Sequence, residues 1–61
     1  MFNKKYSVYF IQEQTATNRV MDVKAASKKE VVDCAKDYIG IWQFEKANMY
    51  WISKKELVVW Y

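Results

Sequence analysis

The chain has 61 residues, one glycine, one cysteine, no histidine and a net charge of +3. Without histidine it lacks the commonest general base and the commonest metal ligand of proteins, so we expect no enzyme activity, metal site or other cofactor. No apolar run approaches the roughly 18 residues that a membrane span requires, and the length fits one small domain over residues 1–61.

Two segments near the N-terminus predict a β-hairpin. Residues 3–12 and 19–25 are rich in aromatic and β-branched side chains, and the polar residues 13–18 between them predict a turn. If Gln12 lies opposite Arg19, the alternation of side chains makes one face of this hairpin wholly apolar. That face consists of Tyr6, Val8, Phe10, Met21, Val23 and Ala25. We therefore expect it to pack against a helix.

Residues 27–40 predict one amphipathic helix with defined ends. Ser27 is a favourable N-cap, Glu30 stands at capping-box spacing from it, and Gly40 suits a left-handed C-cap. At about 100° per residue, the apolar side chains of this segment share an arc of roughly 160°. They are Val31, Val32, Cys34, Ala35, Tyr38 and Ile39. We expect this arc to face the sheet, so that the Cys34 thiol is buried.

After Gly40 the pattern predicts further strands. Residues 41–45 alternate, residues 46–48 suit a hairpin loop, and residues 49–53 and 56–60 form two strands around a turn at residues 54–55. With Ile52 opposite Leu57, one face of these strands carries Trp42, Phe44, Tyr50, Ile52, Leu57 and Val59.

Two alternatives remain open in this half of the chain. Residues 43–49 could form a helical turn, because Glu, Lys, Ala and Met favour helix. Ser53 and Glu56 repeat the capping-box spacing, so that residues from Lys54 onward could form a second helix.

The predicted order is an antiparallel hairpin, one helix and two or three further strands, which is an α+β fold with the helix on one face of a single sheet. In element order this resembles the β-grasp of small immunoglobulin-binding domains. The resemblance implies that the first and last strands lie parallel in the centre of the sheet, which suits the apolar residues 57–61. Because element order alone carries it, the resemblance implies no function.

One helix can cover only one face of the predicted sheet, and the uncovered face carries seven apolar or aromatic side chains. On the registers above they are Tyr9, Ile11, Val20, Met49, Trp51, Val58 and Trp60. Exposed apolar patches mark protein–protein contacts, in which Trp, Tyr and Met are enriched. We therefore predict a partner-binding surface with Trp51 and Trp60 as its main anchors.

This surface favours a non-enzymatic protein-binding module, such as an inhibitor or adaptor. A single cysteine cannot form an internal disulfide, which favours a reducing, cytoplasmic compartment. A short, lysine-rich chain of this kind is typical of small bacterial or phage regulatory proteins. Because a small core must support 18% aromatic residues, we also expect self-association as a two-fold dimer.

Single-stranded nucleic-acid binding is the alternative function. Tyr9, Trp51 and Trp60 could stack bases beside the basic residues of the predicted strands and turns. Those basic residues are Lys4, Lys5, Arg19, Lys24, Lys54 and Lys55. The small net charge and the interspersed acidic residues weigh against this function.

Overall fold

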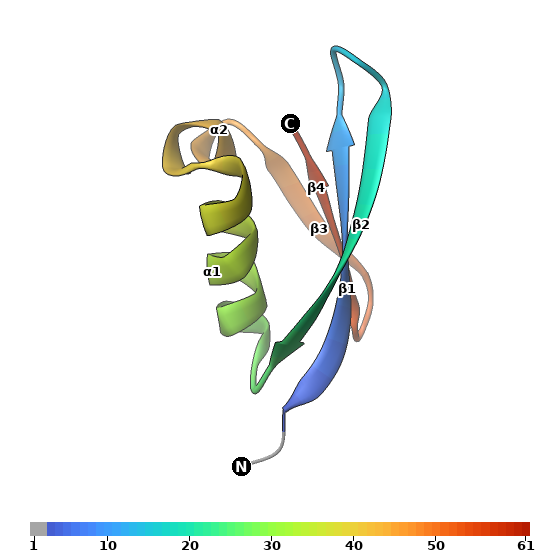
Figure 1. Ribbon diagram of the computed structural model, residues 1–61, viewed down its shortest axis with the longest axis vertical. Coiled ribbons are helices and arrows are strands. Elements are labelled where there is room, and N and C mark those ends of the chain that lie inside the picture. The colour runs from blue at the N-terminus through green and yellow to red at the C-terminus, as the bar shows by residue number, and fades with distance from the viewer. Residues whose placement is uncertain (1–2) are drawn as a thin grey trace.

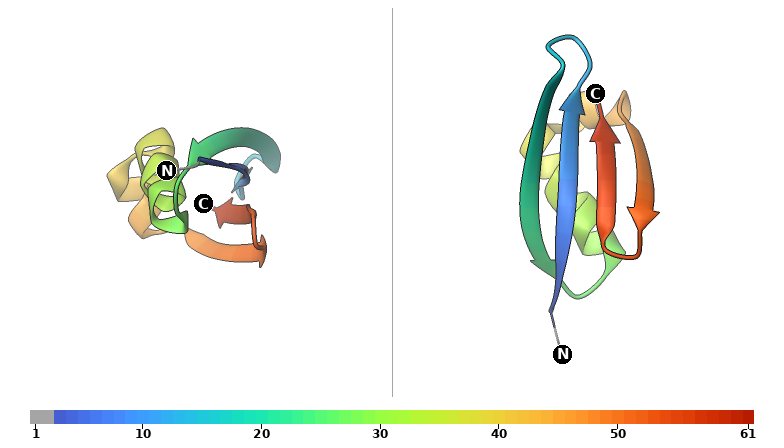
Figure 2. Two further views of the ribbon diagram at one scale, coloured as in Figure 1. Left: turned by 90° about the horizontal axis from the view of Figure 1, so that it is seen from below. Right: turned by 90° about the vertical axis from the view of Figure 1, so that its right-hand side faces the viewer.

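Residues 3–61, described by a computed structural model, form a four-stranded sheet with two short helices on one of its faces (Figure 1). The strands are β1 (Lys4–Gln12), β2 (Thr17–Ala25), β3 (Asn48–Ser53) and β4 (Glu56–Trp60), and the helices are α1 (Lys28–Ile39) and α2 (Ile41–Glu45). Figure 2 shows both helices behind the sheet when its other face is turned to the viewer. The prediction of an α+β fold with a helix on one face of a single sheet is confirmed.

The strand order β2-β1-β4-β3 places the first and last strands in the middle of the sheet. β1 pairs antiparallel with β2 and parallel with β4. β4 is therefore flanked on both edges, and its residues Leu57, Val58 and Val59 are all buried. A strand with neighbours on both edges and buried side chains on both faces needs an uninterrupted apolar sequence, which residues 57–59 supply. This central parallel pair is the arrangement that the β-grasp resemblance implied.

The β1–β2 hairpin turns through residues 13–16, which is a shorter turn than predicted. Gln12 lies opposite Thr17, and Phe10 lies opposite Arg19, so the predicted register is wrong by two residues. A shift of two residues leaves every side chain on its predicted face, because the side-chain period of a strand is two. Ala16 adopts φ 52° in the turn, a left-handed conformation that costs a residue with a Cβ about 1–2 kcal/mol.

α1 begins and ends where the sequence predicts. The Ser27 hydroxyl accepts the Glu30 N–H at 3.5 Å, and the Glu30 carboxylate accepts the Ala26 N–H at 2.7 Å. Two otherwise unpaired donors at the start of the chain's longer helix are thereby satisfied. At the other end Gly40 has φ 86°, and its N–H donates to the Lys36 carbonyl at 2.9 Å.

The prediction that Cys34 is buried is wrong, because its side chain is exposed. The buried residues of α1 are Val31, Ala35 and Ile39, which form a stripe centred on Ala35. Cys34 lies about 100° around the helix from Ala35, beyond the part of the apolar arc that the sheet reaches. Tyr38, on the same flank of the arc, is also exposed.

The strand predicted for residues 41–45 is wrong, because these residues form the single-turn helix α2. The carbonyl of Gly40 accepts the Phe44 N–H at 2.9 Å, so helical hydrogen bonding resumes directly after the break at Gly40. Phe44 packs against the core while Trp42 is 67% exposed, so these two side chains do not share a sheet face. The alternative of a helical turn at residues 43–49 overlaps α2 in part.

The predicted register of the β3–β4 hairpin is wrong by one residue. The turn at residues 54–55 forms as predicted, with Ser53 opposite Glu56. A bulge at Ile52 then places Trp51, rather than Ile52, opposite Leu57. A one-residue shift moves each side chain to the other face. Tyr50 and Ile52, predicted in the core, are exposed, and residues 56–60 form a strand rather than the alternative second helix.

Candidate functional site

The face of the sheet that α1 and α2 leave uncovered carries two adjacent rows of largely apolar side chains. Residues directly opposite one another in a ladder point to the same side of the sheet. The first row is Val20, Tyr9, Val58 and Tyr50, and the second is Asn18, Ile11, Trp60 and Asn48, each read from β2 through β1 and β4 to β3. We call the six apolar and aromatic members, Tyr9, Ile11, Val20, Tyr50, Val58 and Trp60, the open face.

The members of the open face differ in how much surface they offer. Val58 is only 5% exposed and forms the floor between Tyr9 and Tyr50. Val20, Tyr50 and Trp60 are 61%, 50% and 38% exposed, and they stand around this floor. Several large apolar side chains that stand exposed beside one another are typical of a surface that another molecule covers.

Five of the seven residues predicted for the partner surface lie on the open face, and two do not. Tyr9, Ile11, Val20, Val58 and Trp60 have the predicted orientation. Met49 lies opposite Val59 and Trp51 opposite Leu57, so both point to the helix side. The Trp51 ring packs edge-on against Tyr6 at 6.0 Å between ring centroids, and Lys28 Nζ lies 4.6 Å from its centroid.

Tyr50 is the member of the open face that the sequence did not identify. The bulge at Ile52 puts it there, and no residue type in residues 49–53 marks a bulge in advance. A glycine, which often signals a bulge, is absent from this strand.

Tyr9 is held in place by a carboxylate on the neighbouring strand. Its hydroxyl donates to Glu56 Oε1 at 2.9 Å. The hydroxyls of Ser53 and Tyr9 lower the pKa of the Glu56 carboxyl, and the bond to Glu56 raises the pKa of the Tyr9 phenol. The Tyr9 ring is therefore fixed on the open face before any partner arrives.

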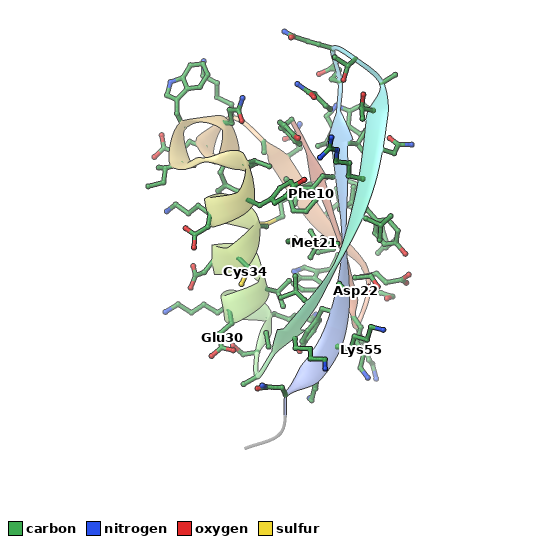
Figure 3. The ribbon with its side chains drawn as sticks, in the orientation of Figure 1. Phe10, Met21, Asp22, Glu30, Cys34 and Lys55 are labelled. Atoms are coloured by element: carbon green, nitrogen blue, oxygen red, sulfur yellow. The ribbon has the colours of Figure 1, made fainter. Side chains whose placement is uncertain are left out.

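The two ends of the open face differ in charge. At one end Lys5 and Lys24 lie opposite each other, with Lys5 Nζ 3.6 Å from the Asp22 carboxylate. Both members of that ion pair are well exposed, so the pair adds little stability. At the hairpin end Glu13 borders a shallow hollow beside Trp60. Figure 3 shows Asp22 and Lys55 projecting on the side away from α1, whereas Phe10 and Met21 point toward it.

Within residues 3–61 the structure contains no group of three or more histidine, cysteine, aspartate or glutamate side chains placed to hold a metal ion. None of the helices in this range is long and apolar enough to cross a bilayer.

Searches against family models, curated proteins and solved structures find no match to this chain.

Proposed function

We propose that the protein is a non-enzymatic protein-binding module that acts through the open face, and that a second copy of the chain is the partner this face fits. The observation that carries the proposal is the placement of six apolar or aromatic side chains on the face that neither helix covers. Covering these side chains removes apolar surface from water, which drives association.

The aromatic members of the open face have the character of interface anchors. Trp60 and Tyr50 lie on the adjacent strands β4 and β3, and Tyr9 lies on β1 beside Val58. Trp and Tyr carry much of the binding free energy at protein interfaces. Because the Tyr9 hydroxyl is already bound to Glu56, less side-chain entropy is lost when this ring is covered.

The charges at the two ends favour a second copy as the partner. A two-fold axis that runs across the strands, between two stacked sheets, brings the hairpin end of one copy to the lysine end of the other. With this axis over the row of Tyr9, Glu13 of each copy approaches Lys5 and Lys24 of the second copy, and the symmetry repeats the contact. Opposite charges at the rim set the relative orientation more than they add affinity.

The size of the face predicts a weak, reversible dimer. The backbone extends over 38, 20 and 15 Å, and the sheet lies in the plane of the longest and shortest of these extents. The two apolar rows occupy only part of this plane, so the apolar surface they offer is smaller than the roughly 800 Å² per partner that a stable interface buries. We therefore expect a dimer dissociation constant in the range of about 10 μM to 1 mM.

Sedimentation velocity over about 10 μM to 1 mM protein tests the proposal. We expect the average mass to rise with concentration from that of a 7.4 kDa monomer toward a dimer. Val20→Lys and Tyr50→Lys place a charge at exposed positions of the open face and should return the protein to a monomer. The matched control is Trp42→Lys on the helix side, which should leave the dimer intact. The proposal would be contradicted if the protein stayed monomeric at every concentration. It would also be contradicted if Trp42→Lys dissociated the dimer as fully as Val20→Lys and Tyr50→Lys.

The nucleic-acid alternative has less support on this face. Trp51, one of its three stacking rings, lies on the helix side. Lys5 and Lys24 stand three rows of residues away from Trp60. A platform for single strands places cations along the path of the stacked bases, and here they are gathered at one end.

A further inference from the structure

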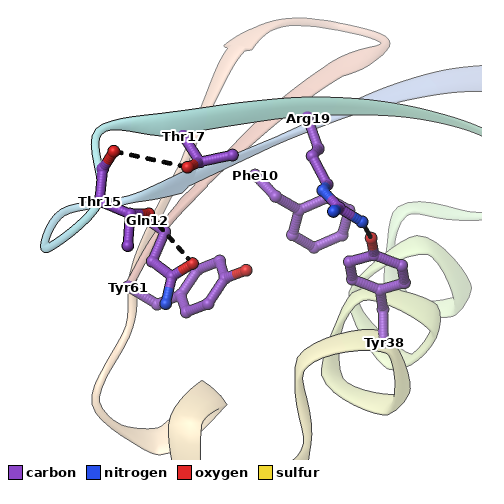
Figure 4. Close-up of a pocket in the computed structure, with 7 residues that line it drawn as sticks. All are labelled: Phe10, Gln12, Thr15, Thr17, Arg19, Tyr38 and Tyr61. Atoms are coloured by element: carbon purple, nitrogen blue, oxygen red, sulfur yellow. Dashed lines mark hydrogen bonds between the residues drawn. The ribbon is translucent and has the colours of Figure 1, made fainter.

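A second surface feature lies on the helix side of the sheet, away from the open face. At the hairpin end a hollow of about 220 Å³ opens between β1, β2 and the last turn of α1 (Figure 4). Its lining consists of Phe10, Gln12, Thr15, Thr17, Arg19, Tyr38 and Tyr61. No member of the open face contributes to it, so what it binds is independent of the function proposed above.

Arg19, the only arginine in the chain, occupies an unusual position in this hollow. It lies opposite the buried Phe10, on the side of β2 that further along the strand carries Met21, Val23 and Ala25. Its Nη1 donates to the Tyr38 hydroxyl at 3.3 Å. Within residues 3–61 the ion pair of Lys5 with Asp22 is the single one formed, so the guanidinium of Arg19 has no carboxylate partner there.

The polar groups around Arg19 are arranged to donate hydrogen bonds. Because the Tyr38 hydroxyl oxygen accepts from Arg19, its own O–H remains free to donate. Gln12 Oε1 accepts the Thr15 hydroxyl at 3.3 Å, which leaves the Gln12 amide N–H groups free. Figure 4 shows the bonded pair of Arg19 and Tyr38 at one end of the hollow, and Gln12 beside Tyr61 at the other end. A set of free donors beside a cation matches a ligand group that can only accept, which is an oxyanion.

The apolar walls of the hollow are held rigidly. The rings of Phe10 and Tyr38 pack with centroids 4.5 Å apart, and Phe10 is fully buried. Tyr61 is tied to β1 by its N–H, which donates to the Ile11 carbonyl at 2.9 Å, and by its carbonyl, which accepts the Glu13 N–H at 2.7 Å. Phe10 is therefore a buried support beneath Tyr38, and the rings of Tyr38 and Tyr61 are the aromatic surfaces that the apolar part of a ligand can contact.

We propose that this hollow binds a small organic acid, with its carboxylate on Arg19 and Tyr38 and its apolar part against the Tyr61 ring. The lining contains one cation and no acidic side chain, which matches a singly charged carboxylate better than a doubly charged phosphate. The planar fork of a guanidinium pairs with the two oxygens of a carboxylate. A dry cavity of about 150 Å³ is known to hold benzene, so the volume here suits an acid the size of benzoate.

Benzoate is the first ligand to test, by titration into ¹⁵N-labelled protein followed by NMR. We expect saturable shifts of the Arg19 side-chain N–H and of the amide signals of residues that line the hollow. Benzamide has the same shape without the charge, and it should bind with at most one tenth of the affinity of benzoate. Equal binding of benzamide, or tighter binding of inorganic phosphate than of benzoate, would overturn the proposal.

Variants identify the groups that hold the carboxylate. Arg19→Gln should weaken benzoate binding at least tenfold, and Gln12→Glu, which adds a negative charge to the lining, should also weaken it. Lys29→Gln removes the same charge from the exposed side of α1, away from both the hollow and the open face, and should leave binding unchanged. Amide spectra of each free variant establish that it is folded. If folded Arg19→Gln bound benzoate with unaltered affinity, the assignment would be overturned. Comparing the affinities of N-acetylphenylalanine and benzoate distinguishes a peptide C-terminus from a free acid as the source of the carboxylate.

Discussion

Trp51 lies directly opposite Leu57, on the side of the sheet that faces α1, although Trp60 on the neighbouring strand points to the other side. The two tryptophans therefore belong to different surfaces of the molecule. Trp51 packs against the core beside Tyr6, whereas Trp60 lies on the open face. This difference decides which of them the fold depends on.

We expect Trp51→Ala to destabilise the fold far more than Trp60→Ala. Loss of a large core side chain costs about 3 kcal/mol or more, which is close to the whole stability of a domain of this size. Trp60→Ala should cost about 1 kcal/mol, since much of this ring already contacts water. Urea unfolding followed by circular dichroism measures both, with the exposed Trp42→Ala as the control. Equal destabilisation by the two substitutions would contradict the register of β3.

The Cys34 thiol should react readily in the folded protein. Its side chain is exposed on α1, so an aromatic disulfide reagent reaches the sulfur without unfolding. We expect the rate in native buffer to lie within about tenfold of the rate in denaturant. A native rate slower by several orders of magnitude would mean that α1 is rotated about its axis relative to the sheet.

The hydrogen bond between Tyr9 and Glu56 should make stability depend on pH at both extremes. The hydroxyls of Ser53 and Tyr9 lower the pKa of Glu56 in the folded chain, so its contribution is present above about pH 4.5 and is lost as the pH falls through the lower folded value. The pKa of Tyr9 is raised, so its contribution is present below about pH 10 and is lost as the pH rises through the folded value.

Tyr9→Phe tests this dependence. The difference in melting temperature between the parent and this variant should be largest near neutral pH and should shrink toward about pH 3 and toward pH values above about 10. Tyr50→Phe, which alters another phenol of the same face, is the control. A difference that stays constant over the whole range would show that the hydroxyl acts through packing alone.

Gly40→Ala should destabilise the protein by about 1–3 kcal/mol through backbone strain alone. Gly40 combines φ 86° with ψ 148°, a conformation that residues with a Cβ rarely adopt, and it connects α1 directly to α2. A Cβ added there would meet nothing within 4 Å, so no steric clash contributes. Urea unfolding measures the loss, and a variant as stable as the parent would contradict this conformation.

The sequence predicted those elements whose local signals agree with their tertiary environment. Ser27, Glu30 and Gly40 mark the ends of α1, and the alternation in residues 3–12 and 19–25 defines both faces of the first hairpin. The error of two residues in that hairpin did no harm, because the side-chain period is two.

The predictions that failed depend on features that sequence patterns do not specify. The bulge at Ile52 moves the side chains of residues 49–51 to the opposite face of the sheet from the one predicted, and no glycine signals it. The apolar arc of α1 is wider than the part of the helix that contacts the sheet. Cys34 lies at the edge of this arc, so it is exposed although the pattern predicts it to be buried. Residues 41–45 alternate like a strand, but the connection from α1 back to the sheet uses them as one helical turn.

The parallel pairing of β1 with β4 also bears on how fast the chain folds. Ser7 must meet Glu56, so the centre of the sheet joins segments that lie near opposite ends of the sequence. The β1–β2 and β3–β4 hairpins each join neighbouring segments, and short loops lose less entropy on closure, so we expect both to form before β1 pairs with β4. Until β4 pairs with β1, one edge of β1 has no neighbouring strand, and its apolar side chains are incompletely covered. Substitutions in β4 that weaken this late pairing should therefore lengthen the time for which the chain can aggregate as well as lower its final stability.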